Sequence, residues 1–227
     1  MRSKVVFLIM VLCSILSIQA QEVRWKLGFE YFFDNLEYKK SSFTDAQTMH
    51  GIWLQPLGGI TWDTAHTLYG GLNLLKIPDT EEVVDKAELV LYYQYETDHV
   101  LFRAGSFSSN EVLHNYSDFF YSDSVSNFMP LMQGLFWQIG GEQNFLNLWL
   151  DWTGYATPET RESFILGSSG KVTKGIFFAD FQSYLFHYAN TLTAIPQYGV
   201  SEHMQLMASA GIAYESENRL KGLLSVG

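Results

Sequence analysis

The sequence is poor in cysteine, in charge and in long hydrophobic runs. Its single cysteine, Cys13, lies within the first twenty residues, so the remainder cannot form an internal disulfide or a cysteine metal site. Charged residues make up 17% of the chain, below the roughly 25% of ordinary soluble domains. The net charge of −10 argues against nucleic acid as a partner, because phosphates require a basic surface. Beyond residue 20, no apolar run approaches the ~18 residues of a membrane helix.

The N-terminal segment 1–20, MRSKVVFLIMVLCSILSIQA, has the layout of a cleaved secretory signal peptide. Arg2 and Lys4 form a basic start, an apolar core follows, and Ala20 is a small residue at the expected cleavage point. A membrane anchor helix is the weaker alternative, because the apolar run is short and no stop-transfer pattern follows it. A lipid-anchored protein is weaker still, because the apolar run continues past Cys13. Residues 21–227 form the mature domain, and cleavage makes it more acidic by two charges.

Aromatic residues are abundant, at 16% of the chain, and the dominant hydrophobic period is two. In WKLGFEYFF and NFLNLWLDW, apolar side chains alternate with more polar ones, which is the strand signature. Helix signals are nearly absent, apart from short turns within 108–130. The pattern predicts about eleven strands, near 25–38, 47–62, 67–76, 85–96, 99–108, 131–139, 144–154, 161–170, 175–187, 203–214 and 219–227.

The connections between these strands alternate strictly between long and short. Short polar turns are expected at 63–66, 97–98, 140–143, 171–174 and 215–218, and longer segments at 39–46, 77–84, 109–130, 155–160 and 188–202. Outer-membrane barrels show this rhythm, because their periplasmic turns are short and their extracellular loops are longer. A soluble β-sandwich has no reason to follow it. The expected fold is therefore all-β, an antiparallel up-and-down transmembrane β-barrel.

The hairpin GLFWQIGGEQNFLNLWLDWTG, residues 134–154, fits this interpretation. Ten residues at ~3.3 Å each, tilted by ~45°, span ~23 Å, close to the ~25 Å apolar band of such barrels. Leu135, Trp137 and Ile139, with Leu146, Leu148 and Leu150, are expected to face lipid. Tryptophans near the strand ends are candidates for aromatic girdles at the two membrane interfaces: Trp25, Trp53, Trp62, Trp137 and Trp152.

A polar set on the opposite faces is the candidate carrier of function. An arginine facing lipid costs ~2–4 kcal/mol near mid-membrane, so these side chains are expected to line the lumen. They could line a pore or simply fill the interior, and an open, acidic pore would favour cations or neutral solutes. The set is Lys26, Glu30, Asn73, Lys86, Glu88, Gln94, Arg103, Gln138, Asn147, Asp151, Asp180 and Gln182.

The sequence has no G-x-S-x-G elbow, Walker loop or dinucleotide glycine motif. Its six histidines lack metal-motif spacing, and the Asp and Asn residues of NYSDFFYSDSVSN resemble calcium ligands only loosely. Some outer-membrane barrels are lipid-modifying hydrolases with Ser and His on the outer wall. Ser183 and His187 share a strand face, but four residues separate them by ~13 Å. We therefore expect no catalytic site, no metal, no cofactor and no enzyme activity.

At GGITWDTAHTLYGGLNLLK, LVLYYQYE, GLFWQ, LNLWLDWTG and YLFHYAN the chain resembles the uncharacterised outer-membrane β-barrel proteins of the Bacteroidota. The resemblance covers residue 25 to the end and rests on diffuse, aromatic-rich strands. It implies an outer-membrane location, contact with outer-membrane lipid and handling by the barrel assembly machinery. Such barrels usually end in a strand with a terminal aromatic residue, whereas this chain ends at Gly227. Bacterial single-chain barrels also have even strand numbers, so we expect a fragment that is incomplete at its C-terminus.

The leading interpretation is an outer-membrane β-barrel of unassigned role, with a passive porin-like channel as the first candidate function. The first alternative is a plugged structural or ligand-binding barrel whose long loops, 109–130 and 188–202, meet an outside partner. The second is a soluble exported β-sandwich that binds glycans through exposed aromatic residues. The sequence does not specify the solute or the oligomeric state.

Overall fold

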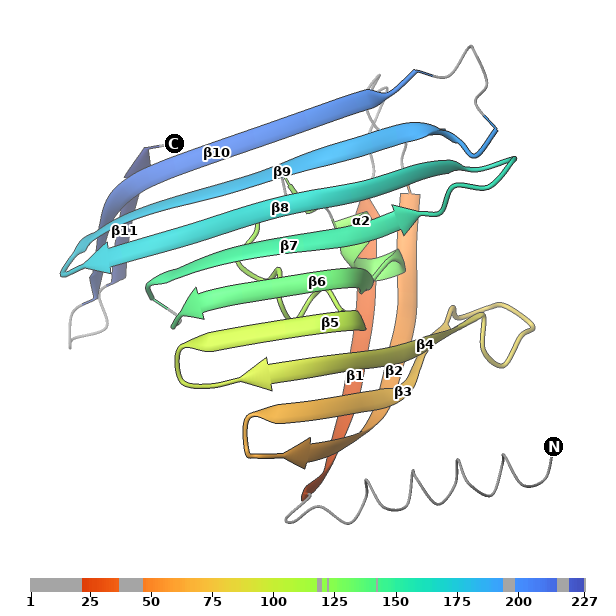
Figure 1. Ribbon diagram of the computed structural model, residues 1–227. Helices are drawn as coiled ribbons and strands as arrows, with labels where there is room; N and C mark the ends of the chain where they lie inside the picture. Colours follow the sequence, from red (N-terminus) through yellow and green to blue (C-terminus); the bar gives the residue numbers. More distant parts are fainter. Residues whose placement is uncertain are drawn as a thin grey trace.

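The computed structural model describes residues 22–36, 47–117, 120–121, 123–141, 143–193, 199–215 and 221–226. The predicted signal peptide and the predicted loop at 39–46 lie outside these residues. Eleven strands and one short helix make up the described part (Figure 1). They are β1 Glu22–Leu36, β2 Gln47–Trp62, β3 His66–Lys76, β4 Lys86–Glu96, β5 Val100–Ser108, α2 Asp123–Phe128, β6 Leu131–Gly140, β7 Phe145–Gly154, β8 Arg161–Lys174, β9 Phe177–Thr191, β10 Ser201–Glu215 and β11 Lys221–Val226.

Each strand pairs antiparallel with the next one in the chain, so the order in the sheet is the order in the sequence. The all-β, up-and-down prediction and most strand positions are thereby confirmed. β1 and β11 are the two edges of the sheet, and the described residues show no pairing between them. No helix among the described residues is long and apolar enough to cross a membrane.

Short turns lie at one end of the sheet and longer connections at the other (Figure 1). The turn predicted at 171–174 is misplaced, because β8 continues to Lys174 and the turn is made by Gly175 and Ile176. Gly175 has a φ of 61°, a left-handed conformation that glycine adopts without a Cβ clash. The connection predicted at 188–202 is shorter than expected, because β9 extends to Thr191 and β10 begins at Ser201.

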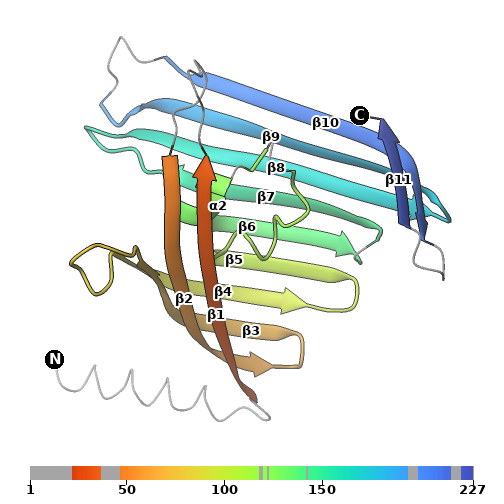
Figure 2. The same cartoon turned by 180° about the vertical axis from the view of Figure 1, so that it is seen from behind.

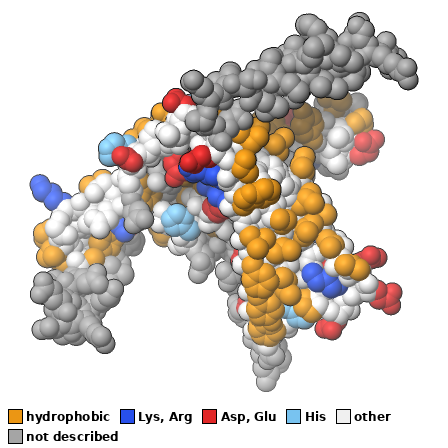
Figure 3. All heavy atoms as spheres, turned by 90° about the horizontal axis from the view of Figure 1, so that it is seen from below, with side chains coloured by type: hydrophobic (Ala, Val, Ile, Leu, Met, Phe, Trp, Pro, Cys, Tyr) orange, Lys and Arg blue, Asp and Glu red, His pale blue; other side chains and the backbone are white. Residues whose placement is uncertain are grey.

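The sheet has two chemically different faces, set by the period-two alternation. On β7, Phe145, Asn147 and Trp149 are buried, whereas Leu146 and Leu148 are 47% and 44% exposed. We call the buried face the inner face and the other the outer face. Hydrophobic side chains form broad exposed areas on the surface seen in Figure 3, with smaller groups of charged side chains beside them.

The connection 109–130 packs against the inner face, and we call it the inner segment. It lies within the curve of the sheet, with α2 close to β1 and β2 (Figures 1 and 2). Its side chains Val112 and Leu113 are 2% and 3% exposed and belong to the main hydrophobic cluster with Phe107 and Phe136. The long loop expected at 109–130 instead folds back onto the strands in its described residues, where its apolar side chains are buried.

Tyr116 anchors the inner segment on β7 and β8. Its hydroxyl accepts a hydrogen bond from Nε1 of Trp149 at 2.9 Å, and its ring meets the indole edge-on. Gly167 lies beneath that indole, where a Cβ atom would come within 2.2 Å of Trp149 Cε2. A glycine at this point of β8 thus makes room for the buried tryptophan that receives the segment.

Replacement of Leu113 by Ala tests the packing of the inner segment. Removing a fully buried leucine leaves a cavity and should lower the free energy of unfolding by about 2–5 kcal/mol. Leu148→Ala is the matched control, because Leu148 lies on the outer face and is 44% exposed. Urea unfolding of the detergent-folded protein, followed by tryptophan fluorescence, measures both. Equal losses in the two variants would contradict the burial of the inner segment.

Candidate functional site

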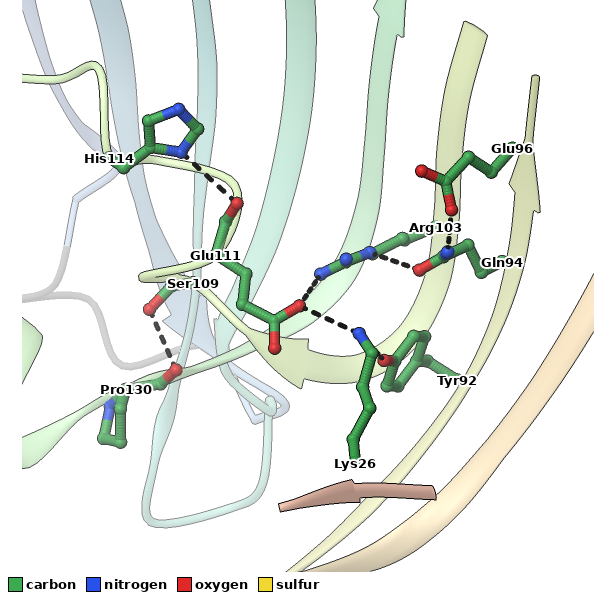
Figure 4. A network of polar contacts seen from close by, with 9 residues as sticks. All are labelled: Lys26, Tyr92, Gln94, Glu96, Arg103, Ser109, Glu111, His114 and Pro130. Carbon is green, nitrogen blue, oxygen red and sulfur yellow. Dashed lines mark hydrogen bonds and ion pairs between the residues drawn. The ribbon is translucent and has the colours of Figure 1, made fainter. Parts of the chain in front are cut away.

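A charged network joins the inner segment to three strands (Figure 4). Glu111 lies in the segment, and its Oε2 is 2.7 Å from Nη1 of Arg103 on β5 and 3.4 Å from Nζ of Lys26 on β1. Nε of Arg103 donates to Oε1 of Gln94 on β4 at 2.9 Å. One carboxylate thus joins the edge strand β1 to the middle of the sheet.

Two cations oppose the effect of burial on Glu111. Burial alone would raise the pKa of its carboxyl group, but Arg103 and then Lys26 stabilise the charged form and hold that pKa below its usual value. The carboxylate is therefore ionised at neutral pH. The Arg103 side chain is only 7% exposed, so its charge depends on Glu111 for compensation.

The structure places the twelve polar residues predicted for the lumen at inner-face positions of their strands, and it brings several of them together. Asn73 bonds both Gln55 and Glu88, and Lys86 pairs with Glu88 at 2.9 Å. Gln182 bonds the backbone of Asn115 and Ser117 in the inner segment. The remaining members of the set lie elsewhere on this face: Lys26, Glu30, Gln94, Arg103, Gln138, Asn147, Asp151 and Asp180. A role in transport stays a prediction.

Four of the five tryptophans proposed for girdles lie on the outer face, with exposed fractions from 37% to 81%. They are Trp25, Trp62, Trp137 and Trp152. Trp53 does not fit the girdle prediction, because it is 3% exposed on the inner face. Its Nε1 donates to the backbone oxygen of Asn127 in α2 at 2.6 Å, and it packs with Phe32 and Leu75. Contact with α2 explains a tryptophan on this face.

A histidine–carboxylate pair lies on the outer face near the long connections. His187 on β9 and Glu202 on β10 are directly opposite each other in the sheet. Nδ1 of His187 is 3.3 Å from Oε1 of Glu202. The imidazole stacks on Phe164 of β8, with centroids 4.7 Å apart, and Phe164 stacks on Trp152 of β7. The imidazole is thus stacked on one ring and hydrogen-bonded at Nδ1, and no hydrogen bond joins its Nε2 to another described residue.

No hydroxyl group lies next to His187 on the outer face. The same-face neighbours along β9 are Leu185 and Ala189. Ser183 is four residues from His187, and its Oγ lies 2.8 Å from Oγ of Ser168 on β8. A direct Ser183–His187 interaction is therefore absent, as their spacing predicted.

Arg161 fastens the strand ends beside this pair. Its Nε donates to the backbone oxygen of Ala189 at 2.6 Å, and its Nη2 donates to that of Gly199 at the same distance. Its guanidinium also lies 3.7 Å from the centroid of the Tyr188 ring. Ala189 lies in β9 and Gly199 just before β10, so the arginine joins the two strands that carry His187 and Glu202.

The other histidines in the described part have different partners. Nδ1 of His66 is 2.6 Å from the Tyr93 hydroxyl, His50 stacks on Phe33, and His203 lies against Tyr184 on the inner face. Only His187 makes an ion pair with a carboxylate among the described residues. These residues also contain no group of three or more His, Cys, Asp or Glu side chains that could hold a metal ion.

Residues 15–224 match the protein family described as lipid A 3′-O-deacylase-type. The chain belongs to this family. No curated protein matches the sequence. The description of the lipid A 3′-O-deacylase-type family names an enzyme activity, so the prediction that the chain is not an enzyme is wrong.

Sequence reasoning missed the pairing of His187 with Glu202. The two residues are fifteen positions apart, and no motif of fixed spacing joins them. The signal was indirect, because two outward positions on adjacent strands meet only in the correct register. Counting back from a turn within 188–202 could have found the pair.

The pH dependence of stability tests the Glu111 network. Because folding lowers the pKa of Glu111, its contribution is present above the unfolded-state value near 4.5 and is lost as pH falls through the folded-state value. The wild type should lose thermal stability in this acidic range, and Glu111→Gln should lose less while being less stable at pH 7. Glu30→Gln is the control, because Glu30 accepts only a 3.5 Å bond from Asn110. Identical melting profiles for Glu111→Gln and wild type would contradict the network.

Proposed function

We propose that this chain is an outer-membrane hydrolase that removes an ester-linked acyl chain from a lipid of the lipid A class. Membership of the lipid A 3′-O-deacylase-type family supports the reaction and the substrate class. The observation that carries the proposal is the His187–Glu202 pair on the outer face, which is where an outer-leaflet lipid would be met. This site lies near the long connections, which face outward in barrels of this kind.

The apolar outer face supports a membrane location. Large hydrophobic side chains on β1, β4, β6, β7 and β10 are 38–81% exposed there, and such a surface is costly in water. In lipid, unpaired strand edges are also costly. Closure of the sheet into a barrel is therefore part of the proposal. The soluble sandwich is disfavoured, because a single meandering sheet forms the described part.

The pair can act as a general base and its orienting carboxylate. Glu202 accepts a hydrogen bond from Nδ1–H of His187, and this tautomer leaves Nε2 unprotonated. Nε2 then takes a proton from a water molecule as its oxygen attacks the ester carbonyl carbon. The bond from that carbon to the sugar oxygen breaks, the proton passes from His187 to the leaving alkoxide, and a fatty acid and an alcohol result. Glu202 also stabilises the transient imidazolium.

Water is the favoured nucleophile because of the neighbours of His187. A serine nucleophile must lie within hydrogen-bond reach of its base, about 2.6–3.2 Å. Leu185, Ala189 and Phe164 surround the imidazole instead, and none of them carries a hydroxyl group. The apolar neighbours can also contact acyl chains while the polar pair faces the ester.

An open channel is disfavoured by the inner segment. Val112, Leu113 and Tyr116 fill the centre of the inner face, and Gln182 bonds the segment from β9. A barrel closed around this segment is plugged, which favours the plugged alternative over a porin-like role.

Ester hydrolysis is tested on vesicles that contain purified lipid A, with acyl loss measured by mass spectrometry. The wild type should release an acyl chain, and His187→Asn should be at least 10²-fold slower, since a general base contributes 10²–10⁴-fold. Glu202→Gln should be slower as well. His203→Asn is the matched control, because His203 lies on the inner face and should leave the rate unchanged. Absence of acyl release by the wild type, or equal rates for wild type and His187→Asn, would contradict the proposal.

A serine-directed fluorophosphonate probe separates the two kinds of nucleophile. If water attacks the ester, the active wild type should remain unlabelled and keep its activity after treatment. Labelling that depends on His187 would show a serine nucleophile and overturn the water mechanism.

Single-channel recording in a planar bilayer tests the plugged state. The wild type should be electrically silent, because the inner segment occupies the space that ions would cross. In a variant, a short Gly/Ser linker replaces residues 110–129. If the sheet closes into a barrel, this variant should give reproducible steps in conductance. Steps of the same size from the wild type would favour the porin-like role instead.

A further inference from the structure

A cavity of about 760 Å³ lies between the inner segment and the inner face of strands β6–β10. The cavity does not have His187 or Glu202 among its lining residues. Its volume falls within the 300–1,000 Å³ range of small-molecule sites. Residues from the segment and from several strands line it together, so folding of the segment builds it.

Aromatic side chains form much of the cavity wall. Tyr116 and Tyr121 come from the inner segment, Trp149 from β7, and Tyr184 and Phe186 from β9. The Tyr116 and Trp149 rings meet edge-on at 5.8 Å, and Phe120 meets Tyr184 edge-on at 5.7 Å. Ring faces attract cations as well as apolar groups, because the π-system carries negative charge above and below its plane.

Two carboxylates line the cavity: Glu88, which is paired with Lys86, and Asp151, which lies among the aromatic side chains without such a partner. Asp151 is held by the backbone instead. Its Oδ1 accepts the backbone N–H of Gln133 at 2.8 Å. No Lys, Arg or His in the described part of the chain makes an ion pair with it. The lysine at the cavity rim, Lys86, is engaged with Glu88 at 2.9 Å. Asp151 thus lacks a positive partner in surroundings where an unpaired charge is costly.

We propose that this cavity binds a small organic cation, with its ammonium group at Asp151 and an aromatic or other apolar body among Tyr116, Trp149 and Tyr184. The carboxylate supplies the counter-charge and the rings supply cation–π and apolar contact. A carboxylic acid or a fatty-acid anion is disfavoured, because its charge would meet Asp151. A neutral apolar molecule would leave the carboxylate without a partner.

Tryptamine and indole-3-acetate are suitable probes, because both are water-soluble and they share one ring system with opposite charges. Isothermal titration of the detergent-folded wild type should show saturable binding of tryptamine and none of indole-3-acetate. Asp151→Asn should weaken tryptamine binding at least tenfold. The matched control is Asp180→Asn, because Asp180 is also an inner-face carboxylate but bonds Ser209 at 2.6 Å and lies outside the cavity wall.

Three outcomes would overturn the inference. They are equal tryptamine affinity in wild type and Asp151→Asn, binding of indole-3-acetate as tightly as tryptamine, and no saturable binding up to millimolar tryptamine. Equal shifts in gel mobility on heating show that the variants fold alike. A second variant, Ile165→Trp, fills the cavity without altering its charge and should also abolish tryptamine binding. His187→Asn should leave binding unchanged, so failure of this inference is distinct from failure of the hydrolase proposal.

Discussion

Every strand of the antiparallel sheet has one side that faces the buried interior and one side that faces outward. These two surroundings require different side chains, and the rest of the structure depends on this constraint. Successive side chains point to opposite faces, so a register shift of one residue would exchange the faces along the whole strand. On β9, Tyr184 and Phe186 point inward to the cavity, while Leu185 and His187 point outward. The described residues of the inner segment pack on the inner face, and the outer face has no protein cover in the described part.

This separation gives the molecule two independent chemical sites on one wall. Outside, His187 and Glu202 meet across β9 and β10, with aromatic rings fixing the imidazole. On the inner face, Asp151 lies in a cavity that is lined by aromatic side chains and partly enclosed by the inner segment. Arg161 joins the ends of β9 and β10, and Glu111 of the inner segment joins β1 to β5. A change on one face should therefore leave the other largely intact.

The strands were predictable because alternation and turn residues are local signals. Within residues 134–154, the predicted lipid-facing side chains such as Leu135 and Leu146 are exposed on the outer face, and Asn147 is buried on the inner face. The inner segment was not predictable, because burial of Val112 and Leu113 depends on side chains such as Phe107 and Phe136, which only the folded sheet brings near. Trp53 was misplaced for the same reason, since α2 is its cover. The His187–Glu202 pair depends on register, and the enzyme activity came from the family match rather than from any motif.

The central claim is that the outer face meets lipid while the inner face does not. The sole cysteine, Cys13, lies in the predicted signal peptide, so single cysteines can be placed freely in the mature chain. Leu206 is 67% exposed on the outer face of β10, and its neighbour Gln205 points inward. A fluorophore on Leu206→Cys in vesicles should be quenched strongly by brominated acyl chains, and one on Gln205→Cys only weakly. Equal quenching at the two positions, or quenching of the Leu206 label by aqueous iodide alone, would contradict the account.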